Sequence, residues 1–211
     1  MFADTLAAMA AQGFAPVLLS AGAVDAATAW LGVLAYTLQI YFDFSGYSDM
    51  ALGLGWLFGL KLPVNFDSPY KAASMVEFWR RWHITLSSFL RDYLYVPLGG
   101  NRGGVARQFR NLAVTMLLGG LWHGAGWTFV LWGGLHGAYL VVNHGFRRLR
   151  ARAGWEPRST RATRALARAT TLAAVVFAWI FFRAESLEVA LAVIRALSPA
   201  AGLAMLPALL P

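Results

Sequence analysis

Histidine is the residue type in this sequence best suited to proton transfer near neutral pH, and four are present. His123 has unusual surroundings, because it lies in the segment GGLWHGAGW between two pairs of glycines. Glycine lets a neighbouring backbone or a ligand approach closely. In an apolar cavity the charged imidazolium is disfavoured, which leaves a neutral ring able to accept a proton. His123 is therefore a candidate general base, and the alternative is a buried structural histidine.

His83 is the second candidate, because it occupies the apolar face of a helix predicted over residues 74–95. Ser74 is the expected N-cap, with Glu77 in the capping-box position and able to pair with Arg81 four residues later. At about 100° per residue, one face of this amphipathic helix collects the apolar residues and the histidine. That face comprises Trp79, Trp82, His83, Leu86 and Leu90.

The other two histidines, His136 and His144, are interpreted as buried structural residues that a backbone carbonyl or a serine satisfies. A metal site is not expected, because the spacings of 40 and 13 residues between His83, His123 and His136 match no common ligand motif. The sequence has no cysteine, which excludes thiol nucleophiles, cysteine-ligated zinc and disulfides.

Asp43 and Asp49 bracket the aromatic stretch YFDFSGYSDM, where a solvated acidic face is hard to envisage. One interpretation makes them functional carboxylates at membrane depth. The alternative gives them structural roles: hydrogen bonds to Tyr41, Ser45 or Tyr47, or helix capping by Asp49. The sequence leaves both open.

The composition predicts that lipid surrounds much of the chain that positions these residues. Hydrophobic residues make up 58% and charged residues 13% of the 211 residues, against roughly 45–50% and about 25% in ordinary soluble domains. A helical membrane span needs about 20 predominantly apolar residues. Candidate segments are 5–23, 26–44, a short 48–60, two helices broken near the middle of 111–146, and a C-terminal span over 170–182 followed by an apolar tail.

The net charge of +8 is unevenly distributed along the chain. Residues 1–60 contain four acidic and no basic residues, whereas eight arginines fall between positions 147 and 168. Arginines beside apolar segments are typical of a cytoplasmic loop, so we predict such a loop over 147–168 and exclude nucleic acid as a partner.

Three segments, in order, resemble the membrane-bound O-acyltransferase superfamily, and within it the bacterial alginate O-acetylase branch. They are YFDFSGYSDMALGLG, FWRRWHITLSSFLRDYLYVPLGGNR and LLGGLWHGAGWTFVLWGGLHG, which together cover about residues 39–137. The relative that exports D-alanine for teichoic acid modification shares much of the pattern.

The resemblance implies an all-α, polytopic membrane protein of the bacterial inner membrane, with short, broken and amphipathic helices around a central tunnel. Such proteins move an acyl group from a thioester to a hydroxyl. The family's active-site histidine corresponds to His123 and the second motif position to His83. No bound cofactor is implied, and acetyl-CoA is the expected donor substrate. Arg80, Arg81 and Arg102 are candidates for contacts with its phosphates at the cytoplasmic mouth, although positive-inside anchoring explains them as well.

In the resulting hypothesis His123 takes the proton of an acceptor hydroxyl, and His83 orients the acceptor or donates to the thioester carbonyl. The acceptor belongs to an exported polysaccharide such as alginate or to a periplasmic acetyltransferase partner. The alternatives are D-alanyl transfer, a non-catalytic transport or scaffold component, and an inactive fragment. Family members are considerably longer, so the chain is interpreted as a single partial domain, the C-terminal portion of such a protein.

Overall fold

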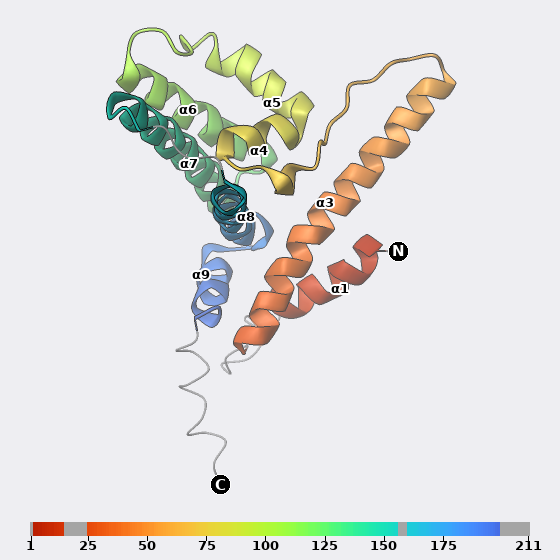
Figure 1. The fold of residues 1–211 in the computed structure, drawn as a ribbon. Helices are drawn as coiled ribbons and strands as arrows, with labels where there is room; N and C mark the ends of the chain where they lie inside the picture. Colours follow the sequence, from red (N-terminus) through yellow and green to blue (C-terminus); the bar gives the residue numbers. More distant parts are fainter. Residues whose placement is uncertain (1, 15–24, 156–159, 199–211) are drawn as a thin grey trace. The chain divides into compact units, whose positions relative to one another are not determined.

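The computed structural model describes residues 2–14, 25–155 and 160–198. Helices and connecting loops account for all of these residues, and no strand occurs among them, so the all-α prediction is confirmed for the described part of the chain. The helices are α1 (Phe2–Phe14), α3 (Ala26–Leu57), α4 (Met75–Arg81), α5 (Ile84–Leu90), α6 (Val105–His123), α7 (Trp127–Arg152), α8 (Arg161–Arg183) and α9 (Leu187–Ala196), as Figure 1 shows.

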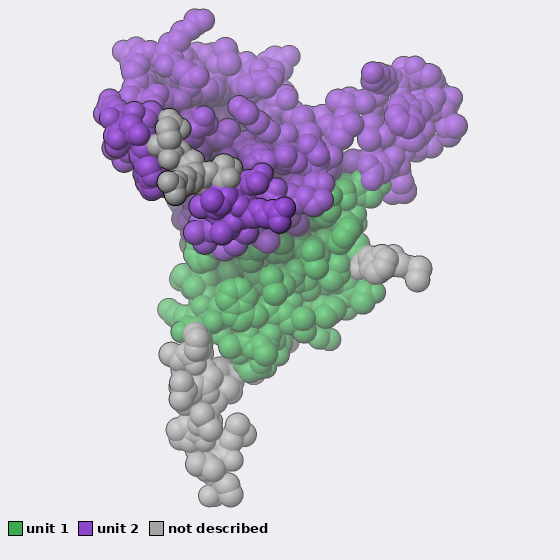
Figure 2. All heavy atoms as spheres, viewed as in Figure 1, with its two compact units in different colours: residues 1–47, 176–211 green, residues 48–175 purple. Residues whose placement is uncertain are grey.

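The chain divides into two compact units, coloured separately in Figure 2. Unit 1 comprises residues 1–47 and 176–211, and unit 2 comprises residues 48–175. Both candidate catalytic histidines lie in unit 2.

Side-chain contacts hold the helices of unit 1 together. Trp30 of α3 donates its indole N–H to the Leu197 carbonyl beyond α9 at 3.2 Å. The Arg183 guanidinium lies over the rings of Phe14 in α1 and Tyr36 in α3, at 5.6 and 5.9 Å from their centroids. These cation–π contacts place the end of α8 against the first two helices of the unit.

Unit 2 is built on the helix pair α6 and α7, which a turn of only three residues connects (Figure 1). So short a connection folds two helices back against each other. This confirms the prediction of two helices broken near the middle of 111–146. Helices α4 and α5 also belong to this unit, and a single π-helical turn, Arg91–Tyr95, follows α5.

The expected separation between segments 26–44 and 48–60 is wrong, because both belong to the continuous helix α3. Gly46, Gly53 and Gly55 lie inside this helix without breaking it. Glycine costs roughly 1 kcal/mol of helix propensity but keeps its backbone hydrogen bond, whereas proline removes one.

The single helix expected over 74–95 is also wrong, because it breaks at His83. The start is as predicted: the Glu77 N–H donates to the Ser74 hydroxyl at 3.2 Å, and Glu77 pairs with Arg81 at 2.9 Å. The break has a tertiary cause. Asn65 accepts from the backbone N–H of Ile84 at its carbonyl and from that of Thr85 at its side chain, so these N–H groups leave the helical pattern.

The basic segment 147–168 is largely helical rather than a loop. Helix α7 continues to Arg152 and α8 begins at Arg161, because arginine is a strong helix former whatever side of a membrane it faces. The predicted span 170–182 lies inside α8. The first candidate, 5–23, forms α1 only as far as Phe14, and residues 15–24 and 199–211 lie outside the described part.

Within the described ranges, α8 is the one helix whose length and mean hydropathy, 1.8 over its most apolar stretch, suit a membrane crossing. By length and mean hydropathy, the described helices therefore include fewer membrane spans than the sequence predicted. In α3, for example, Gln39, Asp43 and Asp49 interrupt the apolar residues.

Candidate active site

His123 occupies the last position of α6, and a close approach of α6 to α7 places it. A Cβ on Gly120 would collide with the Phe129 carbonyl and stand 3.1 Å from the Gly133 Cα. The two backbones therefore touch where only glycine fits. One turn further along, the half-buried His123 ring meets Trp132 of α7 at right angles, with 5.2 Å between ring centroids.

His83 stands between α4 and α5 in the left-handed backbone conformation, with φ of 42° and ψ of 58°. This conformation is uncommon for a residue with a side chain. The His83 ring is half-buried, and its Nδ1 lies 3.2 Å from Oδ1 of Asn65. Because an amide oxygen can only accept, Nδ1 carries the proton of this hydrogen bond, and Nε2 of the neutral ring carries the lone pair.

Asn65 is the main site residue that the sequence reasoning missed. Its side-chain oxygen accepts from the Thr85 hydroxyl at 3.0 Å as well as from His83, and its backbone carbonyl accepts from Ile84. Asn65 lies in the proline-flanked loop LPVNFDSP, whose composition indicated only a chain break. No spacing links it to His83, so the contact is visible only in the folded chain.

The structure brings His83 and His123 into electrostatic reach of each other. Burial, together with a smaller contribution from the positive charge that His123 can carry, lowers the pKa of His83 from 6.5 to about 4. At neutral pH the His83 ring is therefore uncharged. The junction between α4 and α5 and the end of α6 thus place two imidazoles, 40 residues apart in the sequence, close enough to interact electrostatically.

His136 is fully buried behind this site, within a cluster of aromatic rings. Its Nδ1 accepts a hydrogen bond from the indole N–H of Trp79 at 3.2 Å, a partner that the sequence did not indicate. Phe78 stacks on the ring at 6.0 Å, and Trp132 meets it at 4.9 Å. Trp132 therefore lies between His136 and His123.

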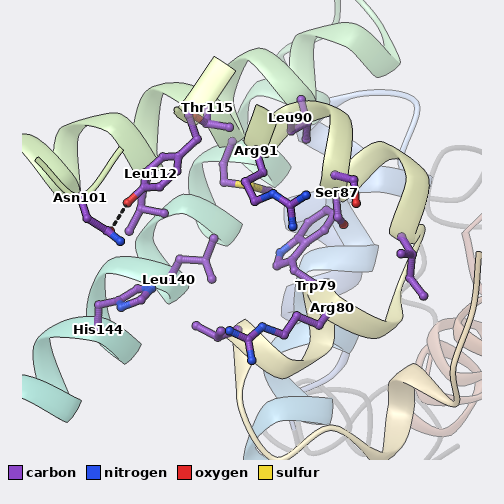
Figure 3. A pocket seen from close by; sticks show the side chains of 15 residues that line it. Trp79, Arg80, Ser87, Leu90, Arg91, Asn101, Leu112, Thr115, Leu140 and His144 are labelled. Atoms are coloured by element: carbon purple, nitrogen blue, oxygen red, sulfur yellow. Dashed lines mark hydrogen bonds between the residues drawn. The ribbon is translucent and has the colours of Figure 1, made fainter. Parts of the chain in front are cut away.

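A pocket of about 380 Å³ opens beside Trp79 (Figure 3). Figure 3 shows Arg80 of α4 and Arg91 of the π-helical turn directed into this space, with His144 of α7 on its wall. Arg91 is also paired with the neighbouring Asp92 at 2.7 Å. The two arginines make the pocket positively charged, and Trp79, which lines it, also contacts His136.

Of the three arginines expected to contact a cofactor, Arg80 lines the pocket and the other two do not. Arg81 pairs with Glu77 and with Asp67 on the other side of α4. Arg102 is exposed on the loop that precedes α6. His144, expected to be structural, lines the pocket instead.

The glycine-rich loop before α6 is held by side-chain hydrogen bonds. Asn101 accepts from the Tyr95 hydroxyl and from the Gln108 amide, both at 2.6 Å, and Arg148 donates to Gln108 at 2.6 Å. Asn111 donates to the carbonyl of Gly100. This network fixes the side of the pocket that Tyr95 and Asn101 form (Figure 3).

Asp43 and Asp49 are exposed in the interior of α3. Because α3 continues to Leu57, Asp49 caps no helix, and this structural alternative is wrong. Among the described residues, no group of three or more histidine and acidic side chains is arranged to hold a metal ion.

Comparison with known proteins identifies relatives for almost the whole chain. A sequence model of the membrane-bound O-acyltransferase family matches residues 24–191, which include His83, His123 and the pocket. A probable alginate O-acetylase of Pseudomonas aeruginosa is 52% identical over 188 residues, which are 89% of this chain and 34% of that protein.

Two further relatives carry different names. A peptidoglycan O-acetyltransferase of Helicobacter pylori is 50% identical over 167 residues, 79% of this chain and 31% of the relative. A teichoic acid D-alanyltransferase of Streptococcus thermophilus is 39% identical over 126 residues, 56% of this chain and 30% of the relative. The chain thus spans about a third of the length of these relatives. The match over residues 24–191 shows that the chain belongs to the membrane-bound O-acyltransferase family.

Proposed function

We propose that this chain carries the catalytic histidines of a multi-pass inner-membrane enzyme that moves an acetyl group from cytosolic acetyl-CoA towards a hydroxyl of an exported polysaccharide. The observation that carries the proposal is that His83 and His123, 40 residues apart in the sequence, lie within electrostatic reach of each other, inside the region that the family model matches. Alginate is the favoured polymer because the relatives that cover 89% of the chain are named as alginate O-acetylases.

In the proposed reaction, His123 accepts the proton of the acceptor hydroxyl while the hydroxyl oxygen attacks the thioester carbonyl. The carbon–sulfur bond then breaks, and the proton passes from His123 to the departing thiolate, which leaves as free coenzyme A. The histidine returns to its neutral state, so the proton balance closes. The rings of Trp132 and Phe129 beside His123 exclude water that would otherwise hydrolyse the donor.

His83 is assigned the role of orienting the acceptor, through a hydrogen bond from a hydroxyl other than the one whose proton His123 takes. With its Nδ1 proton donated to Asn65, the neutral ring presents Nε2 as a hydrogen-bond acceptor. Such a ring can accept from a hydroxyl but cannot donate to a thioester carbonyl. Of the two roles expected from the sequence, the hydrogen bond to Asn65 supports the first.

The positively charged pocket is the proposed site for the phosphorylated part of acetyl-CoA. Arg80, Arg91 and His144 can all donate hydrogen bonds to phosphate oxygens, and they come from three different elements. Trp79, which lines the pocket, contacts Trp132, and Trp132 in turn meets His123. A periplasmic acetyltransferase that completes the transfer to the polymer is the proposed partner.

Replacement of His123 by Ala tests the proposal, in the protein encoded by its native gene. General-base catalysis typically contributes 10²–10⁴-fold, so acetyl transfer should fall by about that factor at unchanged membrane abundance. Leu118→Ala, at an exposed position of the same helix, is the matched control. Acetylation at the unsubstituted rate in the His123→Ala variant would contradict the assignment.

D-alanyl transfer is the second candidate, and the relative named as a teichoic acid D-alanyltransferase supports it. Purified protein supplied with radiolabelled acetyl-CoA separates the candidates. Turnover of free acetyl-CoA that depends on His123 supports acetyl transfer. Turnover only with a D-alanyl thioester carried by a protein supports the alternative, and no turnover with either donor supports a transport or scaffold role.

A further inference from the structure

A fully buried histidine, His136, takes no part in the proposed reaction. One ring, that of Trp79, connects it to the pocket, while another, that of Trp132, connects it to His123. Its Nδ1 accepts the Trp79 indole N–H, which excludes the imidazolium form and the Nδ1–H tautomer. His136 is therefore a neutral ring with its proton on Nε2. Four aromatic side chains surround it: Phe78, Trp79, Trp132 and Tyr139.

Two of these rings, Trp79 and Trp132, also contact each other, and Trp132 contacts His123 in the candidate active site. Trp132, 2% exposed, contacts His136 at 4.9 Å and Trp79 at 6.0 Å between centroids. Trp132 also meets His123, at 5.2 Å between centroids. A displacement of His136 would therefore move both indoles, and with them the surface on which the His123 ring rests.

Resting on the proposed function, we infer that His136 is a positioning residue for acyl transfer. It anchors Trp79 by a hydrogen bond and Trp132 by ring contact, and the two indoles together hold His123 in its reactive orientation. Because Trp79 also lines the pocket, this arrangement connects the wall of the donor site to the general base through one buried histidine.

Histidine meets two requirements at this position that other residues meet only singly. Phenylalanine would supply a ring of similar size but would leave the buried Trp79 N–H without its acceptor. Glutamine would supply an acceptor without the ring. The site has little room to adjust, because the adjacent Gly137 packs so close to α6 that a Cβ would stand 3.2 Å from the Ala113 Cα.

The test compares His136→Phe with His136→Gln in the protein encoded by its native gene, with Val142→Ala on the exposed side of α7 as the control. Misplacement of a catalytic group by about 1 Å can cost about 100-fold. We expect His136→Phe to lower kcat by roughly 10- to 100-fold with the KM for acetyl-CoA changed by less than about threefold. His136→Gln should recover a substantial part of kcat.

A second measurement does not depend on activity. Diethyl pyrocarbonate modifies neutral imidazoles, and mass spectrometry of the peptide that contains His123 gives the rate at that residue. The rate should rise in His136→Phe and return towards the unsubstituted value in His136→Gln. Trp79→Phe, which removes the hydrogen bond from its donor end, should raise it as well and serves if His136→Phe does not accumulate.

The outcomes separate this inference from the proposed function. An unchanged kcat and an unchanged rate of His123 modification in His136→Phe would overturn it, as would equal impairment of the Phe and Gln variants. If His123→Ala retained full activity while the modification rates changed as expected, the positioning contact would stand and the catalytic assignment of His123 would fall.

Discussion

At the scale of single residues, the hydrogen bonds of the histidines decide which chemistry each can do. Two of them use Nδ1 in opposite ways. In His83 it donates to an amide oxygen, and in His136 it accepts from an indole. The first arrangement leaves the lone pair on Nε2 of His83, and the second leaves the proton on Nε2 of His136. Residues of one type therefore take different roles because of their partners.

The depressed pKa of His83 predicts a pH dependence of stability. Between pH 6.5 and about 4 the unfolded chain binds a proton at His83 and the folded chain does not, so the free energy of unfolding falls as the pH falls through this range. We expect His83→Gln to flatten that part of the pH profile. The measurement is Tm in detergent between pH 4 and pH 7, for both proteins. Profiles of identical slope would show that the His83 pKa is not lowered by folding.

At the scale of elements, the glycine contact between α6 and α7 sets the register that puts His123 beside Trp132. A Cβ at Gly133 would collide with the carbonyl of Met116, and a Cβ at Gly120 would collide with that of Phe129. Both obstacles are backbone atoms inside helices, which cannot move aside as a side chain can. The helix pair is therefore sensitive to the smallest possible substitution at these two positions.

Gly133→Ala should destabilise the protein by about 1–3 kcal/mol, the usual cost of overpacking, and lower acetyl transfer because His123 shifts with α6. The adjacent Gly134→Ala is the matched control, since its Cβ would meet only the Leu117 side chain at an ordinary 3.6 Å. Tm and activity of the two variants test the contact. Equal effects of the two substitutions would contradict a specific role for Gly133.

At the scale of the whole molecule, the comparisons and the large exposed apolar surface agree on a membrane environment. Trp56 and Trp127, for example, are 70% and 72% exposed in the isolated chain, and many other large apolar side chains are exposed as well. Water-soluble monomers rarely expose so much apolar surface. Within unit 2, four helices, the π-helical turn and the loop before α6 combine to form the pocket, so its charge is a property of the fold rather than of one segment.

Arg80→Gln should raise the KM for acetyl-CoA by roughly tenfold, with a smaller effect on kcat, because one charge-assisted hydrogen bond to phosphate is worth about 1.5–3 kcal/mol. Arg164→Gln removes the same charge from an exposed position on α8 and should leave KM unchanged. Steady-state kinetics at fixed ionic strength provide the test. The KM values of Arg81→Gln and Arg102→Gln show how much the other two arginines contribute to binding of acetyl-CoA. A KM in Arg80→Gln equal to that of the control would place the donor elsewhere.

The sequence by itself determined the helical class, the family, the N-cap at Ser74 and the two-helix arrangement around Gly124. These features follow from local signals: hydrophobic periodicity, a capping box and glycine runs act over a few residues. His83 and His123 could be singled out because unusual neighbours surround each of them in the chain.

Only the tertiary structure decided the break at His83, the partnership of His136 with Trp79 and the choice of Arg80 rather than Arg102 for the pocket. Asn65 contacts His83 at the break between α4 and α5 from 18 residues away, and Trp79 reaches His136 across 57 residues. Such contacts depend on where folding brings distant backbone and side-chain groups together. A local sequence pattern does not show which distant groups will meet. A backbone N–H group leaves its helical hydrogen bond for a tertiary one only when folding brings the tertiary acceptor within reach.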